Sequence, residues 1–214
     1  MKNLSTFESD YHNLTFTKLF TYCAGRGIIL KEDTFEKELC FKTEKGKYNI
    51  LAQLFSDNCD ISIKINFYST ETKNDSLIKI KEIKESCLIL VLDKVLQYGD
   101  VINLIQADER NRIMERIDVP LFDIDAFNEF VFDAFAFNDW ARGKTPIISI
   151  FNNRIEIETY IENGELDDNC LYDLLLKLHV LDECEVETIE SHDENIITIN
   201  KNTMVFTLPF KFLD

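Results

Sequence analysis

The hydrophobic period of the chain changes near residue 61, and this change constrains the fold more than any other feature of the sequence. Every second residue from 61 to 67 is apolar, which predicts a half-buried strand. Upstream, apolar residues at helical spacing predict helices over residues 14–24, 33–39 and 48–55. A chain that mixes the two periods in this way is expected to fold as an α+β protein.

The second half of the sequence continues this mixture. Pro120 separates an extended segment at 112–119 from a helix at 123–140 that is rich in phenylalanine. Asn152 and Asn153 are expected to form a two-residue hairpin turn between two strands, because asparagine tolerates positive φ. The patterns also predict a loop at 69–76, a long helix at 83–105 with a break at Gly99 and Asp100, strands at 147–151 and 154–158, a helix at 171–178, and strands at 196–199 and 204–210.

The chain is strongly acidic, and the excess of negative charge is concentrated. Its 39 acidic and 23 basic residues give a net charge of −16. Residues 151–194 contain 14 acidic residues against only Arg154 and Lys177, a net charge of −12. Direct binding to nucleic acid is therefore not expected, because phosphate binding requires lysine and arginine. The basic surface of a protein is the natural partner, although solubility alone also explains such charge.

The six cysteines indicate a reducing environment. They lie far apart, without a C-x-x-C pair or a histidine at zinc-ligand spacing. We therefore expect buried thiols, no metal and a cytoplasmic location. No signal peptide or membrane-spanning apolar run is recognisable in the sequence.

Three segments carry a resemblance to a known family: residues 46–52 (GKYNILA), 120–151 (PLFDIDAFNEFVFDAFAFNDWARGKTPIISIF) and 154–157 (RIEI). The chain resembles bacterial proteins described as transcriptional regulators or RecG-like ATP-binding proteins. In these, a Schlafen-type AlbA nucleic-acid domain precedes a GHKL (Bergerat-fold) ATPase-like domain. The similarity runs from about Leu14 to Phe210 and begins after the AlbA domain would end, so we expect that domain to be absent.

The resemblance implies a fold and a division of the chain. It implies a GHKL-like two-layer sandwich with a mixed, mostly antiparallel sheet in residues 108–214. A smaller region of helices and strand, residues 1–107, would precede it. Such a division would be a tight one, because the sequence contains only three prolines and six glycines and no flexible linker.

The helix at 123–140 would carry the catalytic and metal-binding positions of the family. There, a Glu that activates water is followed one turn later by an Asn that coordinates Mg²⁺, and here Glu129 and Asp133 occupy these positions. Side chains at i and i+4 share a helix face, and Asp is still an oxygen ligand, so the pair is a candidate metal site. Two such carboxylates also form an ordinary polar stripe on many helices.

The two phosphate-binding loops depart from the family pattern. Consecutive glycines that approach the nucleotide are replaced by Ile161 and Glu162, and the glycines of L-G-x-x-E-x-x-G-x-G are replaced by Glu185 and Glu187. Each extra carboxylate within about 4 to 6 Å of a triphosphate would cost on the order of 1 to 4 kcal/mol per charge pair. The sequence therefore predicts a degenerate nucleotide site that holds no cofactor. The protein is accordingly not expected to be an enzyme.

Three functional hypotheses follow. The first is a non-catalytic acidic module that binds a nucleic-acid-handling protein, for example as a phage or mobile-element inhibitor of a CRISPR effector. The second is a regulator that still binds Mg-ATP through Glu129 and Asp133. The third is an assembly subunit that pairs with a full-length relative or forms a homodimer. For the first, the expected contact residues are Glu162, Glu165, Asp167, Asp168, Asp182, Glu183, Glu185 and Glu187.

Overall fold

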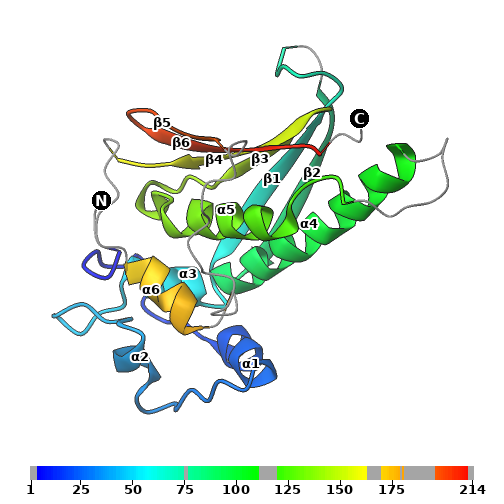
Figure 1. The fold of residues 1–214 in the computed structure, drawn as a ribbon. Helices are drawn as coiled ribbons and strands as arrows, with labels where there is room; N and C mark the ends of the chain where they lie inside the picture. Colours follow the sequence, from blue (N-terminus) through cyan, green and yellow to red (C-terminus); the bar gives the residue numbers. More distant parts are fainter. Residues whose placement is uncertain are drawn as a thin grey trace.

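The computed structural model describes residues 4–74, 77–110, 120–162, 170–178, 180 and 196–211. Six strands form one sheet in the order β2-β1-β3-β4-β6-β5 (Figure 1). Four neighbouring pairs are antiparallel, and β1 and β3 are parallel. The strands are β1 (Asp60–Tyr68), β2 (Leu77–Ser86), β3 (Ile147–Ile150), β4 (Arg154–Tyr160), β5 (Ile196–Ile199) and β6 (Thr203–Pro209).

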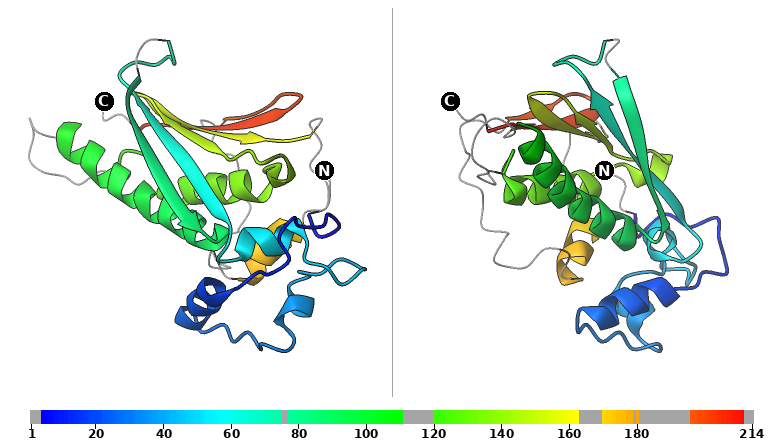
Figure 2. Two further views of the ribbon diagram at one scale, coloured as in Figure 1. Left: turned by 180° about the vertical axis from the view of Figure 1, so that it is seen from behind. Right: turned by 90° about the vertical axis from the view of Figure 1, so that its right-hand side faces the viewer.

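Two long helices form the second layer. α4 (Leu88–Arg110) and α5 (Ile124–Ala136) lie side by side on one face of the sheet, and no described helix covers the opposite face (Figure 2). Near one end of this layer lie the shorter helices α1 (Thr17–Gly25), α2 (Phe35–Glu38), α3 (Ile50–Phe55) and α6 (Cys170–Lys177) (Figure 1). The predicted α+β two-layer sandwich with a mixed, mostly antiparallel sheet is confirmed.

The sheet and its core include residues from both predicted parts of the chain. β1 and β2 precede residue 108, and the other four strands follow it. Ile63 and Ile65 of β1 belong to the same buried cluster as Ile157 and Phe206 of β4 and β6. The boundary at residue 108 therefore crosses one continuous sheet, and a division into two parts stays a prediction.

One strand is missing from the sequence prediction. We expected a loop at 69–76 and a helix from residue 83, but β2 occupies Leu77–Ser86 and α4 begins only at Leu88. Most β2 residues are exposed because the strand lies at the edge of the sheet. Its sequence consequently lacks the strict alternation of apolar and polar residues that identifies a half-buried strand.

The predicted break at Gly99 is wrong, because α4 continues through it. A methyl group on Gly99 would lie 2.3 Å from Cε1 of Phe127, which belongs to α5. Carbon atoms in contact normally lie about 3.5 to 4.0 Å apart. Glycine at this position therefore permits the close approach of the two helices rather than ending one of them.

Candidate functional site

α5 is held against the sheet by its aromatic residues. Asp123 caps the first turn, where its Oδ1 accepts hydrogen bonds from the backbone N–H groups of Asp125 and Ala126 at 3.1 and 3.3 Å. Phe130 packs against Phe206 of β6, with 5.1 Å between ring centroids. The helix ends at Ala136, four residues earlier than predicted, and Trp140 lies in a separate 3-10 turn, η1 (Trp140–Arg142).

Glu129 and Asp133 are one turn apart on this helix, and both are half-buried. Burial, and to a smaller extent the neighbouring Glu129 carboxylate, raises the pKa of Asp133 to about 7. Burial also raises the pKa of Glu129, whose Oε2 is buried without a hydrogen-bond partner. Within the described part of the chain, neither carboxylate forms an ion pair.

Tyr172 of α6 lies near the two carboxylates. Burial raises the pKa of its hydroxyl, and the charges of Asp133 and Glu129 raise it further. The Tyr172 ring lies against Phe132 and Phe137 of α5, at centroid distances of 5.3 and 5.8 Å. The two acids therefore lie in a partly apolar setting, where a negative charge is costly unless a cation approaches.

Two carboxylate oxygen donors one turn apart match part of a magnesium site. In the described residues, no group of three or more His, Cys, Asp or Glu side chains is placed to hold a metal. Mg²⁺ commonly keeps several water ligands and is also held by substrate phosphates, so two carboxylates can take part in its binding. The predicted pair is therefore assembled, and its chemistry is compatible with a cation.

Ile161 and Glu162, which replace the glycines of the first loop in the resembled family, have different surroundings. Ile161 is 1% exposed and belongs to the core, and its N–H donates to the Asn202 carbonyl at 3.1 Å. The Glu162 carboxylate forms an ion pair of 2.6 Å with Arg142, which also contacts Asp139 at 2.9 Å. Glu162, the one predicted partner-contact residue in this segment that the structure describes, therefore already has a cationic neighbour within the chain.

A buried polar network behind this loop was not predicted. The Asn138 amide donates to the Lys144 carbonyl at 2.8 Å, and its oxygen accepts from the Thr159 hydroxyl and the Tyr160 N–H at 3.1 and 3.2 Å. Trp140 Nε1 donates to the Phe135 carbonyl at 2.8 Å. The network joins the end of α5 to β4. The only sequence signal for it is an Asn-Asp-Trp run directly after a helix, which is typical of turns in general.

The remaining predicted site residues lie outside the described residues. These are Glu165, Asp167, Asp168, Asp182, Glu183, Glu185 and Glu187, so their role in a degenerate phosphate loop or in partner binding stays a prediction.

The described cysteines are all free thiols. Cys23 and Cys87 are buried, and burial raises the pKa of Cys23 to about 11 and that of Cys87 to about 12. Thiols with a raised pKa are poor nucleophiles near neutral pH, so neither is a candidate for nucleophilic catalysis.

Among the described helices, none combines the length and the apolar character that crossing a bilayer requires.

Comparison with known proteins supports the fold but identifies no family. No protein-family model matches the sequence, and no curated protein matches it. The structure is similar to the crystal structure of the DIP2311 protein from Corynebacterium diphtheriae, with a TM-score of 0.70 and 13% sequence identity. The match covers 98% of this chain and 48% of that protein, so the chain spans about half its length. At this identity, the likeness shows that the two share a fold.

Proposed function

We propose that the chain is a non-catalytic acidic protein-binding module, and that its partner presents a basic surface used for handling nucleic acid. The observation that carries this proposal is the pair Glu129 and Asp133, which forms no ion pair with any residue that the structure describes and in which the pKa of Asp133 is raised to about 7. An arginine or lysine from a partner would favour the charged form of both acids and form charge-assisted hydrogen bonds.

The surrounding features support the same proposal. The net charge of −16 favours approach to a basic surface and opposes approach to nucleic acid. Ile161 fills with a core side chain the position where the resembled family has a glycine, which speaks against a nucleotide at that loop. A basic channel of a nuclease, such as a CRISPR effector, is a specific version of the partner.

Competition with nucleic acid tests the proposal. The purified protein is titrated into a complex of a candidate nuclease with fluorescently labelled nucleic acid, at two salt concentrations. We expect release of the labelled strand, with weaker competition at higher salt. The variant Glu129→Gln/Asp133→Asn should compete at least tenfold less well, whereas the exposed Asp125→Asn on the same helix should change competition little. Retention of nucleic acid at saturating protein across candidate nucleases would refute the channel-blocking version.

A second candidate is binding of Mg-ATP, and the placement of two carboxylate oxygen donors on one turn of α5 favours it. This regulator would bind nucleotide without requiring hydrolysis. A ligand present at about 100 times its dissociation constant adds roughly 2.7 kcal/mol to the free energy of unfolding. Thermal unfolding with Mg-ATP, with Mg²⁺ alone and with ATP plus a chelator separates the cases. An unchanged melting temperature at millimolar Mg-ATP would exclude this candidate.

A further inference from the structure

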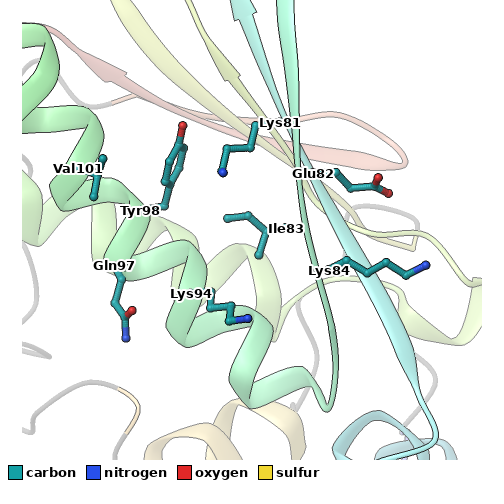
Figure 3. A pocket seen from close by; sticks show the side chains of 8 residues that line it. All are labelled: Lys81, Glu82, Ile83, Lys84, Lys94, Gln97, Tyr98 and Val101. Carbon is teal, nitrogen blue, oxygen red and sulfur yellow. The ribbon is translucent and has the colours of Figure 1, made fainter.

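The free edge of β2 lies at the opposite side of the sheet from β5 and forms a groove with α4. Among the described residues, β2 pairs only with β1, through nine residue pairs between Leu77 and Ser86, and a register shift leaves Ile78 without a partner in β1. The groove encloses about 400 Å³, and its lining includes Lys81 and Ile83 of β2 and Tyr98 and Val101 of α4 (Figure 3). In antiparallel ladders, alternate residues direct N–H and C=O groups to either side, so about five residues of β2 offer these groups to a further strand.

The charge of this edge is opposite to that of the whole chain. Lys79, Lys81 and Lys84 lie within six residues of β2 that contain one acidic residue, Glu82, and none of the three lysines forms an ion pair within the described residues. The neighbouring Glu85 is neutralised by Lys18 and Lys94. A basic, unpaired strand edge in a chain with a net charge of −16 therefore favours an acidic occupant.

The two faces of β2 differ in chemistry. Lys81 and Ile83 point toward α4, whereas Glu82 and Lys84 point away from it (Figure 3). Lys81 Nζ lies 5.0 Å from the centroid of the Tyr98 ring, at the groove. Ile78 and Ile80 are 68% and 54% exposed, and the register of Ile80 with Asn66 of β1 places Ile80 on the face away from α4. An added strand would thus meet Lys81 and Ile83 on the helix side, and Ile80 with the charged Glu82 and Lys84 on the other side.

We infer that the β2 edge binds an extended acidic segment of a partner protein, which adds to the sheet as a seventh strand beside β2. Acidic side chains at alternate positions would face Lys79, Lys81 and the α4 groove. An intervening apolar side chain would pair across the strands with Ile80. This surface is separate from the carboxylate pair on α5, so it describes a second contact rather than the one proposed above.

Two other roles agree less well with the residues of this edge. One is protection against aggregation, and the other is the binding of single-stranded nucleic acid. Lysine on an edge strand discourages pairing with other sheets, but that role does not account for the exposed Leu77, Ile78 and Ile80 on the same strand. Single-stranded nucleic acid usually binds a row of stacking aromatic residues. Among the residues that the structure describes, Tyr98 is the one aromatic side chain that lines the groove, and it lies against Lys81. The unpaired backbone of β2 matches the hydrogen-bonding pattern of another strand.

Fluorescence anisotropy with a labelled, end-capped eight-residue peptide of alternating Glu and Val tests the inference on the whole chain. We expect saturable binding to the wild-type protein, and no binding by the matching Lys/Val peptide. Lys81→Glu should weaken binding of the Glu/Val peptide at least tenfold. Lys84→Glu, which makes the same change of charge on the opposite face of the same strand, should weaken it about twofold or less. Thermal melting of both variants checks that they fold.

A second probe does not depend on any variant. Methylation of alternate backbone nitrogens of the Glu/Val peptide removes the hydrogen bonds of an added strand while it keeps the charges, and it should abolish binding to the wild-type protein. Equal binding of the methylated peptide would overturn the inference, as would failure of the unmethylated peptide to bind. Displacement of the Glu/Val peptide by an oligothymidine would also overturn it. So would a dimer of the wild-type protein in sedimentation velocity that the Lys81→Glu substitution dissociates.

Discussion

Substitution of Gly99 by alanine gives the sharpest test of how the helical layer is packed. A methyl group at this position would lie 2.3, 2.6 and 3.2 Å from Cε1, Cδ1 and Cζ of Phe127. The ring cannot easily move away, because Phe127 is 1% exposed and packs against Phe122 at a centroid distance of 5.5 Å. To restore an ordinary contact of about 3.5 Å, the helices must separate or the ring must shift by more than about 1 Å.

Two opposing terms set the magnitude. Alanine is favoured over glycine inside a helix by roughly 0.8 to 1.0 kcal/mol. Overpacking of a tight core costs typically about 1 to 3 kcal/mol and sometimes more. Because the clash involves the side of a buried ring, we expect an overpacking cost in the upper part of this range, about 2 to 3 kcal/mol, which leaves a net loss of roughly 1 to 2 kcal/mol. For a chain of this size, that loss lowers the melting temperature by about 2 to 8 °C.

Urea and thermal unfolding, followed by circular dichroism at 222 nm, measure the effect. Gly25→Ala is the matched control, because Gly25 is also a helical glycine and a methyl group there would meet no atom within 4 Å. That variant should gain up to about 1 kcal/mol. Phe127→Leu should relieve part of the Gly99→Ala loss in a double-mutant cycle. Equal stability of Gly99→Ala and wild type would show that the helix contact does not require glycine.

The remaining predictions concern single residues. The pKa of Asp133 is raised from its ordinary value of 3.8 to about 7, so the folded state retains a proton that the unfolded chain releases, and stability should fall as pH rises between these values. The free energy of unfolding of Asp133→Asn, measured by urea titration, should therefore exceed that of wild type by roughly 1 to 3 kcal/mol at pH 8 and equal it near pH 4. A constant difference across pH would contradict this reasoning. Cys40 is exposed and has φ of 55° at the end of α2, so Cys40→Gly should raise the free energy of unfolding by about 0.5 to 1 kcal/mol in urea titrations, and a loss would refute strain at this residue. Asn138→Ala leaves the Tyr160 N–H and the Lys144 carbonyl without their partner, so it should cost roughly 2 to 3 kcal/mol by the same titration, and a neutral effect would show that water replaces the amide.

The sequence predicted those elements that bury one clear face. β1 and β4 alternate in burial along their length, and their apolar residues identified both strands. The i and i+4 spacing of Glu129 and Asp133 was also sufficient to place them together on α5. β2 was missed because an edge strand exposes much of both faces. The order of its Ile and Lys residues therefore does not show which side chains are buried.

Contacts between distant residues escaped prediction for a different reason. The ion pair of Arg142 with Glu162 depends on the path of a 3-10 turn and of the segment after β4, which no local pattern specifies. Gly99 was interpreted as a helix break because glycine has low helix propensity, whereas its role depends on a ring from another helix. Local periodicity therefore predicts the elements, and the packing partners require the structure.

The parallel pairing of β1 with β3 has a consequence for how the chain is made. Ile65 of β1 pairs with Ile148, so β1 cannot gain this neighbour until about 80 further residues have been synthesised. At about 5 to 20 residues per second, that delay lasts roughly 4 to 16 s. During this time the edge of β1 that pairs with β3 has no partner strand on the ribosome, and contacts of such long sequence separation form slowly. The nascent chain should therefore be a chaperone substrate until β3 emerges, and ribosome-bound chains ending before and after Ile150 should differ in protease resistance.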